Sequence, residues 1–334
     1  MIQASIVGVV TAIVSSSSET TILRTAVGSP PAMGLVHRLK AEGVRVIGVD
    51  SSPLSAGLYL TDNAYVVPRG DDPRFLEEIL RICDVENPRM IISGPEEEVL
   101  TLSKNKQSFK NVVLLCPDYE TASVCANKIK TYEYLERLDI PIPRIYSPDK
   151  AVFPCIVKPA FGRGGRGVFK AETEHEIELF MKKVPNPIVQ EYLNGQECSV
   201  DTLADLNGTP LSIVPRLRIE VESGVSMKGV TFYDKELINT CQRIVESFKL
   251  VGPACMQCIK QDDGYKFTEI NTRFGGGSIL SINADPSVVS NIIRMATGMT
   301  PLPSSGFTAD LVMLTYYSTI FAGRHQLKRR GSCQ

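Results

Sequence analysis

The segment that decides the fold reads Thr268-Glu269-Ile270-Asn271-Thr272-Arg273-Phe274-Gly275-Gly276-Gly277. Glu269 and Asn271 are two residues apart, so in a strand their oxygen-bearing side chains share one face. Arg273 and three consecutive glycines follow at once. This is poor strand sequence, and it suits close approach of the backbone to a ligand. The segment therefore predicts a catalytic centre at the end of a strand.

The same segment forms one arm of a predicted hairpin. Its turn is Gln261-Asp262-Asp263-Gly264, a strong turn sequence between two apolar strands. If the turn centres on Asp263, Gln257 lies directly opposite Glu269. Gln257, Glu269 and Asn271 then present three oxygen donors on one face, which suits Mg²⁺. The alternative is an ordinary exposed strand face.

A second glycine-rich segment is Lys158-Pro159-Ala160-Phe161-Gly162-Arg163-Gly164-Gly165-Arg166-Gly167. Successive backbone N–H groups in such a loop can form a nest for an anion, and Lys158 adds a point charge for phosphate. The loop lacks the Gly-Lys-Ser/Thr ending of a P-loop, and it leads into a strand rather than a helix. It predicts a phosphate site of another type; the alternative is a flexible hairpin with solvated arginines.

The first part of the chain alternates short apolar strands with helices, which is typical of a parallel α/β sheet. We expect strands at 21–25, 44–49, 64–67, 90–92 and 112–115, and helices at 32–42, 72–83 and 97–104. The loops at 28–31, 50–52 and 94–96 follow strands and are expected to line one crevice. Gly28 with Asp50 imitates a nicotinamide site, but Gly-Ser-Pro-Pro-Ala-Met-Gly does not give Gly-x-Gly-x-x-Gly.

The chain changes character near residue 118. Residues 118–138 indicate a helical linker, which Pro141 and Pro143 close. An α+β region follows, with strands expected at 155–158, 168–170 and 188–191 around a helix at 174–183, and longer strands at 198–206, 211–221, 254–260 and 265–270. The apolar stretch 309–321 is expected to be a core strand and helix, or an interface.

Composition excludes several classes of function. The 334 residues carry a formal net charge of −1, which argues against nucleic acid or an anionic membrane as partner. The nine cysteines are scattered, as in reduced cytoplasmic proteins, and Cys255-x-x-Cys258 lacks a second pair to complete a zinc site. Residues 6–14 are apolar but too short to span a bilayer. We expect a cytoplasmic protein with an N-terminal extension.

Four motifs occur in an order that resembles the ATP-grasp superfamily. They are Asn127-Lys128 followed by Leu135, Pro154-x-Ile156-Val157-Lys158-Pro159, Gln190-Glu191-Tyr192-Leu193-x-Gly195-x-Glu197, and Glu269-Ile270-Asn271-x-Arg273. The resemblance covers roughly residues 20–320 and is strongest to the carbamoyl-phosphate synthase large subunit-like group of carboxylate–amine ligases.

The resemblance implies an α/β then α+β chain: an N-terminal Rossmann-like pre-ATP-grasp domain, then a two-subdomain ATP-grasp fold. The implied boundaries are an N-terminal extension at 1–19, the pre-ATP-grasp domain at 20–117, a helical linker at 118–150, the small lid subdomain at 151–193, and the large subdomain with a C-terminal tail at 194–334.

The resemblance also implies roles for particular positions. Those implied for ATP are Lys128 and Lys158 on the phosphates, Gly162, Gly164, Gly165 and Gly167 in the lid, Glu191 and Leu193 at adenine, and Glu197 at the ribose. Gln257, Glu269 and Asn271 would hold Mg²⁺, or Mn²⁺. The neutral Gln257 leaves the number of ions, one or two, open.

The remaining positions concern catalysis and the second substrate. Arg273 and Lys158 would be catalytic, with Arg273 stabilising the transferring phosphoryl group or the acyl-phosphate. Those implied for the substrate are Arg216, Arg218, Lys228, Gly28 and Ser29.

The implied activity is a Mg²⁺-dependent ligase that uses ATP to activate a small-molecule carboxylate as an acyl-phosphate. An amine, thiol or similar nucleophile then displaces phosphate. Two other hypotheses stay open: kinase-type phosphorylation of a small acceptor, as in carbamoyl-phosphate synthase, and a nucleotide-binding regulatory protein without catalysis. The chain has one copy of the unit, which argues against complete carbamoyl-phosphate synthesis by a monomer. A homodimer is an open alternative.

Overall fold

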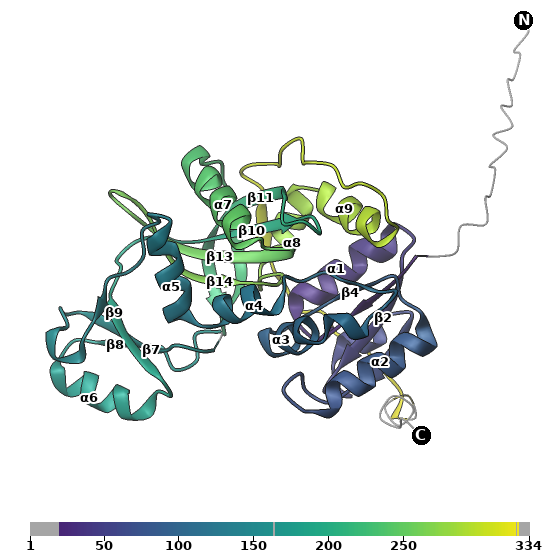
Figure 1. Ribbon diagram of the computed structural model, residues 1–334, viewed down its shortest axis with the longest axis horizontal. Coiled ribbons are helices and arrows are strands. Elements are labelled where there is room, and N and C mark those ends of the chain that lie inside the picture. The colour runs from purple at the N-terminus through teal and green to yellow at the C-terminus, as the bar shows by residue number, and fades with distance from the viewer. Residues whose placement is uncertain (1–19, 163, 325, 327–334) are drawn as a thin grey trace, which may run out of the picture.

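The computed structural model describes residues 20–162, 164–324 and 326. The predicted extension at 1–19 and the last residues of the tail lie outside the described residues. Three units follow one another along the long axis of the molecule (Figure 1): a parallel-sheet domain, a central antiparallel sheet, and a small sheet at the far end.

The N-terminal domain is a five-stranded parallel sheet in the order β3-β2-β1-β4-β5. Its strands are β1 (Thr21–Arg24), β2 (Arg45–Asp50), β3 (Asn63–Val66), β4 (Met90–Ile92) and β5 (Val113–Leu114), and its helices are α1 (Pro30–Ala41), α2 (Arg74–Glu86) and α3 (Glu96–Lys104). The predicted parallel α/β sheet is confirmed. Because the chain leaves β1 on one side and returns as β4 on the other, the strand order reverses between β1 and β4.

The small unit is a four-stranded antiparallel sheet in the order β6-β9-β7-β8. Its strands are β6 (Ile145–Tyr146), β7 (Cys155–Pro159), β8 (Phe169–Ala171) and β9 (Pro187–Glu191), covered by α6 (Glu174–Lys183). Two helices precede it, α4 (Tyr119–Ala126) and α5 (Lys128–Arg137). Strand β6 pairs with β9 although it lies within the stretch predicted as linker, because the extended chain after Pro143 reaches the sheet edge.

The central sheet has six strands in the order β14-β13-β10-β11-β12-β15. They are β10 (Glu197–Ala204), β11 (Pro210–Glu222), β12 (Val225–Thr231), β13 (Gly252–Gln261), β14 (Gly264–Asn271) and β15 (Val312–Leu314). Helices α7 (Lys235–Phe248), α8 (Ser278–Ala284) and α9 (Ser287–Ala296) complete the unit. The sequence analysis did not predict β12, α7, α8 or α9.

The N-terminal domain and the central unit share one hydrophobic core. Leu35 and Leu39 of α1 pack with Phe274, Val289 and Ile292 in a single buried cluster. The helices also come close, since a Cβ atom at Gly34 of α1 would lie 2.6 Å from the Cδ1 atom of Ile279 in α8. This continuous packing fixes the parallel sheet against the central sheet.

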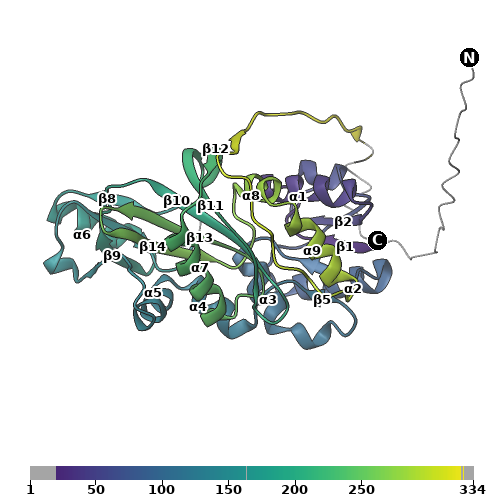
Figure 2. The ribbon, with the colours of Figure 1, turned by 90° about the horizontal axis from the view of Figure 1, so that it is seen from above.

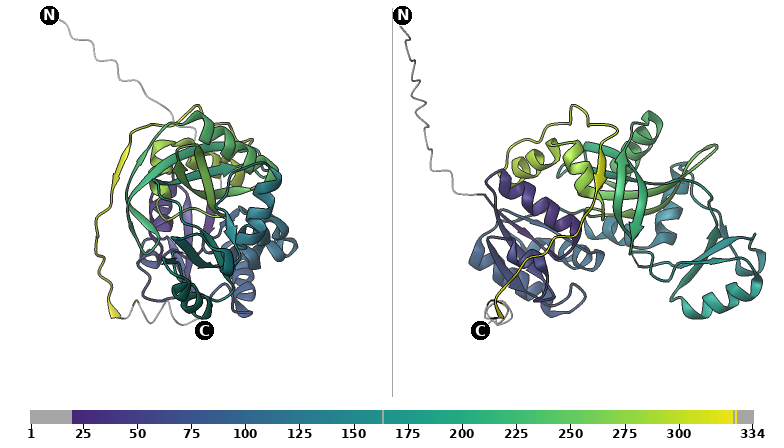
Figure 3. Two further views of the ribbon diagram at one scale, coloured as in Figure 1. Left: turned by 90° about the vertical axis from the view of Figure 1, so that its left-hand side faces the viewer. Right: turned by 180° about the vertical axis from the view of Figure 1, so that it is seen from behind.

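The stretch at 309–321 is not a core strand and helix. Only β15 forms there, at the edge of the central sheet, and Leu314, Tyr316 and Phe321 are exposed. The segment after β15 runs from the central sheet toward the N-terminal domain, as Figures 2 and 3 show from two sides. Within the described ranges, no helix is both long enough and apolar enough to cross a membrane.

Candidate active site

A cavity of about 810 Å³ lies where the three units meet. Loops after β1, β2 and β4 line one side, which confirms the predicted crevice at 28–31, 50–52 and 94–96. The glycine loop, the end of β9 and the faces of β11, β13 and β14 line the rest. Its volume falls within the range of small-molecule sites. Of the eighteen positions predicted for the site, Gly167 and Lys228 do not line it.

The hairpin of β13 and β14 has the predicted pairing of Gln257 with Glu269, but for a different reason. Gln261 pairs with Gly264, so the turn has two residues rather than a centre on Asp263. A bulge then shifts the register, since Cys258 pairs with Phe267 and Gln257 with Glu269. Thr268 is the extra residue of this bulge. The bulge thus restores the pairing that the shorter turn would have displaced.

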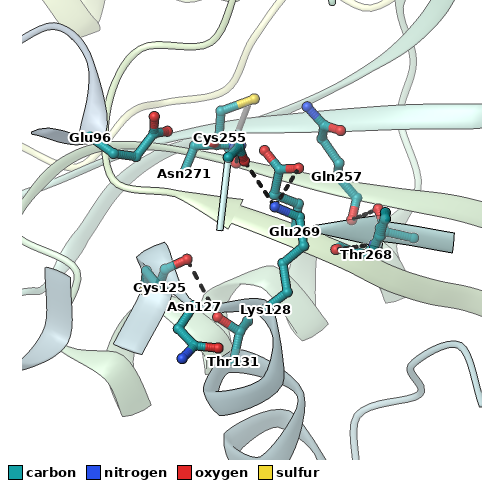
Figure 4. Close-up of polar contacts among 12 residues, drawn as sticks. Glu96, Cys125, Asn127, Lys128, Thr131, Cys255, Gln257, Thr268, Glu269 and Asn271 are labelled. Carbon is teal, nitrogen blue, oxygen red and sulfur yellow. Dashed lines mark hydrogen bonds and ion pairs between the residues drawn. The ribbon is translucent and has the colours of Figure 1, made fainter. Parts of the chain in front are cut away.

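Gln257, Glu269 and Asn271 lie close together at this end of the hairpin (Figure 4). Glu269 forms an ion pair with Lys128, with 3.7 Å between its Oε2 atom and the lysine Nζ. Asn271 accepts a hydrogen bond from Arg273 Nη2 at 3.2 Å and donates one to the Cys255 carbonyl at 3.4 Å. One carboxylate and two amide oxygens are the donors that a hard divalent cation prefers, so the residues fit Mg²⁺.

Lys158 is the last residue but one of β7 and is 6% exposed. Its ammonium donates to the Tyr132 hydroxyl at 2.9 Å, and that hydroxyl donates to the Thr268 carbonyl at 2.9 Å. Burial, and then the nearby Lys128 ammonium, lower the pKa of Lys158 to about 7, against the opposing effect of Glu269. The lysine is therefore poised to gain a proton when anionic groups approach. The sequence analysis missed Tyr132.

Lys128 is the first residue of α5, whose N-cap is the Asn127 side chain. Its backbone N–H donates to the Ala160 carbonyl at 3.0 Å, and its ammonium donates to the Gly162 carbonyl at 2.9 Å. The start of α5 is thus tied to the glycine loop. Both predicted phosphate lysines are buried, and both lie beside Glu269, with which each interacts electrostatically.

The glycine loop also touches the hairpin between β11 and β12. A Cβ atom at Gly224 would lie 2.5 Å from the Cα of Gly164, so the two backbones are in contact. Gly164, Gly165 and Gly167 all have positive φ angles, which glycine adopts without strain. Gly167 nevertheless lies outside the cavity lining, and its φ angle explains its identity.

The residues predicted for adenine and ribose line the cavity near the end of β9. The Glu191 carboxylate pairs with Lys266 at 2.7 Å, so its side chain is already engaged, and Leu193 is buried. Glu197 forms an ion pair with Arg218. Arg218 also donates to the Gly224 carbonyl at 3.0 Å. The structure therefore joins a predicted ribose residue and a predicted substrate residue in one contact.

The other basic residues predicted for the substrate differ in position. Arg216 is fully buried, and its Nε donates to Asp201 at 2.7 Å. Burial lowers its pKa, but the Asp201 carboxylate outweighs this effect and raises the pKa above the ordinary value. Lys228 is partly exposed on β12, pairs with Glu220, and does not line the cavity. Its position does not support a contact with substrate.

The three glycines after Arg273 pack against protein groups. A Cβ atom at Gly275 would lie 2.5 Å from the Cys255 sulfur, and one at Gly277 would lie 2.8 Å from Arg216 Nη1. The glycines thus let the chain cross the buried Arg216 group before α8 begins. Arg273 itself pairs with Glu96 of α3 at 3.1 Å, which links the predicted catalytic segment to the N-terminal domain.

The wall supplied by the N-terminal domain holds two buried charges that the sequence analysis missed. Arg24 at the end of β1 is 2% exposed, and Glu98 in the first turn of α3 is 7% exposed. Burial raises the pKa of Glu98 to about 7 and lowers that of Arg24 to about 10. Both line the cavity. Arg24 ends one strand and Glu98 follows another, and these two strands, β1 and β4, lie on either side of the point where the strand order reverses.

Gly28 and Ser29 line this wall as well. The Gly28 N–H donates to Asp50 Oδ2 at 2.8 Å, and Asp50 Oδ1 accepts from the Ser52 N–H at 3.0 Å. Pro30 and Pro31 occupy the first two positions of α1, so these positions have no N–H to offer a pyrophosphate. This argues against dinucleotide binding at the Gly28 loop.

Residues 125–277 match the family model described as ATP-grasp domain, and residues 22–115 match the PylC-like, N-terminal domain. The chain contains an ATP-grasp domain. Its N-terminal domain is PylC-like. The carbamoyl phosphate synthase large chain of Clostridium botulinum (strain Eklund 17B / Type B) is 28% identical over 229 residues, which are 63% of this chain and 20% of that protein. The chain spans between about a fifth and about a half of the length of the curated relatives it matches.

Solved structures with the same ATP-grasp fold resemble nearly the whole chain. The biotin carboxylase–βγ-ATP complex from Campylobacter jejuni has a TM-score of 0.70 at 16% identity, covering 88% of this chain and 74% of that one. The L-amino acid ligase from Bacillus licheniformis has a TM-score of 0.66 at 17% identity, covering 85% and 75%. These matches confirm the fold predicted from the sequence: a Rossmann-like domain followed by an ATP-grasp fold.

Proposed function

We propose that this chain is an ATP-dependent ligase that activates a small-molecule carboxylate as an acyl-phosphate and joins it to an amine or similar nucleophile. One observation carries the proposal. Lys128, Lys158 and Arg273 line the same cavity as the Glu269 face, so phosphate-binding cations and metal-binding oxygens meet beside space for a second molecule.

In the proposed reaction a carboxylate oxygen attacks the γ-phosphorus of ATP. The new P–O bond forms as the bond to ADP breaks, and the nucleophile then displaces phosphate from the acyl carbon. Gln257, Glu269 and Asn271 would hold Mg²⁺ or Mn²⁺, which neutralises phosphate charge when it is bound. Lys128 and Lys158 orient the phosphates, and Arg273 stabilises charge on the transferring group. The L-amino acid ligase and the βγ-ATP complex among the similar structures support this assignment.

Acceptor-dependent release of ADP tests the proposal. Purified protein with MgATP is screened against carboxylic acids, amino acids, hydroxy acids and bicarbonate, with and without amines. Release that needs both a carboxylate and an amine supports ligation. If ¹⁸O from a labelled carboxylate then appears in phosphate, the acyl-phosphate route is supported. ADP release with bicarbonate alone would favour the carbamoyl-phosphate synthase-like alternative, which the related large chain supports.

Magnesium-dependent ATP binding without ADP formation, over the whole panel, would instead favour a regulatory protein. We place the ligase in the cytoplasm, because the eight cysteines in the described part of the chain are free and buried. Its partners would be small molecules. Sedimentation at several concentrations decides between a monomer and a homodimer.

A further inference from the structure

Arg24 and Glu98 are opposite charges buried in one cavity wall; they attract each other electrostatically but do not approach closely enough to form an ion pair. No ion pair of Arg24 or Glu98 occurs within the described part of the chain. Among the described residues, the Glu98 carboxylate accepts hydrogen bonds only from neutral donors, the Thr25 hydroxyl and the Gly94 N–H. Arg24 donates through Nη1 to the carbonyls of Thr25 and Ile92, at 2.7 and 3.0 Å. Its Nε is buried and has no hydrogen-bond partner among the residues that the structure describes.

Buried charges of this kind are costly, because neutral groups replace only part of the hydration that they lose. In most proteins such groups pair with each other or neutralise. Here both line the substrate cavity, so a bound molecule can supply the missing partners. The Arg24 guanidinium, whose hydrogen bonds go to neutral carbonyl groups, favours an anionic oxygen, and the Glu98 carboxylate favours a charged donor.

The position of the two residues in the fold points the same way. Arg24 ends β1, and Glu98 lies in the first turn of α3, which follows β4. The strand order reverses between β1 and β4, and in open α/β sheets ligands bind in the crevice at such a point. Arg24 and Arg273 both line the cavity, so two guanidinium groups border the same space. After burial, which lowers the pKa of Arg24, and Glu98, which raises it, Arg273 is the next cause and lowers it.

We propose that this crevice binds the carboxylate substrate as a zwitterionic amino acid, with its ammonium group on Glu98 and its carboxylate between Arg24 and Arg273. The assignment rests on the proposed ligase function and narrows its acceptor to molecules that carry both charges. Arg273 then holds the same carboxylate that attacks ATP, while Glu98 stays with the amine and takes no part in the transfer. Glu98 is a specificity residue.

The test compares Glu98→Gln with wild-type protein, using amino acids, their N-acetyl derivatives and their desamino counterparts as acceptors. Of these three kinds of acceptor, we expect only the amino acids to support ADP release. Glu98→Gln should raise the KM for amino acids by about tenfold to a hundredfold and leave the affinity for MgADP unchanged. Glu120→Gln is the matched control, because Glu120 is a first-turn carboxylate of α4, is exposed, and does not line the cavity.

Folding is monitored at the same time. Glu98 titrates above its ordinary range, so its burial costs stability as the pH rises from the ordinary value toward 7, and the cost is largest above that. Glu98→Gln should therefore melt at a higher temperature than wild type at alkaline pH while losing its response to the amino group. A variant that is more stable yet impaired is not explained by a structural role.

Three outcomes separate this inference from the ligase assignment. If desamino acids work as well as amino acids, or if Glu98→Gln keeps the wild-type KM, the inference is wrong and the ligase assignment stands. If calorimetry shows amino acids binding in a Glu98-dependent manner but no acceptor yields ADP, the ligase assignment fails and the amino acid site stands. If amino acids neither bind nor react, the inference is overturned.

Discussion

The low pKa of Lys158 predicts that nucleotide affinity falls as the pH rises. Burial and the neighbouring Lys128 hold the pKa at about 7, against an ordinary value of 10.5, so above that pH the lysine is mainly neutral in the free protein. Phosphate groups favour the charged form, and binding must then bring a proton with it. With a pKa near 7, affinity should fall by about tenfold for each pH unit above it, or about fifty-fold from roughly pH 7 to 9.

Isothermal titration with MgADP measures this directly. Titrations at pH values of about 6, 8 and 9, in buffers of different ionisation enthalpy, give both the affinity and the number of protons taken up. We expect uptake to approach one proton at alkaline pH and to vanish in the acidic range. Lys158→Met should bind weakly with no uptake, and Lys182→Met, which removes an exposed lysine of α6, should match wild type. A flat affinity with no proton uptake in wild type would refute the reasoning.

Three further predictions follow from single contacts. Tyr132→Phe removes the hydroxyl between Lys158 and the Thr268 carbonyl, so unfolding by urea should show a loss of about 1–3 kcal/mol; an unchanged midpoint would contradict that hydrogen bond. Arg218→Met leaves Glu197 without its cation, so discrimination between ADP and 2′-deoxy-ADP should change; identical ratios would remove Glu197 from the ribose site. Gly275→Ala places a methyl group against Cys255 and should cost about 1–3 kcal/mol, measured by thermal unfolding, and a variant as stable as wild type would contradict the packing.

The sequence predicted the parts of the fold whose patterns are local. Strands of the parallel sheet are short apolar runs between turn residues, and they form where expected. Helix α7 has apolar residues at Leu237, Cys241, Ile244 and Phe248, a helical spacing that carried a usable signal but was missed. Strand β12 alternates only weakly between apolar and polar residues and contains Gly229. It forms because it pairs with β11, and its own sequence gives little signal for a strand.

The candidate site contains features that cannot be predicted from a single segment of sequence, because they depend on contacts between distant segments. The pairing of Gln257 with Glu269 was reached from a turn centre that the structure does not have, because a bulge cannot be seen in one strand alone. The glycines after Arg273 were predicted to allow close approach to a ligand, and Gly275 and Gly276 do line the cavity. Their contacts with Cys255 and Arg216, which come from other strands, could not be predicted from the segment itself. Arg24 and Glu98 become partners of one cavity only through tertiary structure.

The most direct test of the account concerns Glu269, the only carboxylate on the predicted metal face. ADP release by wild-type protein, with MgATP and the best acceptor from the screen, is compared with release by Glu269→Ala. Because Glu269 also pairs with Lys128, the substitution removes both the predicted metal ligand and the ion pair of a lysine predicted to bind phosphate. The account predicts that acceptor-dependent ADP release disappears while the variant stays folded. Acceptor-dependent release at the wild-type rate would contradict it.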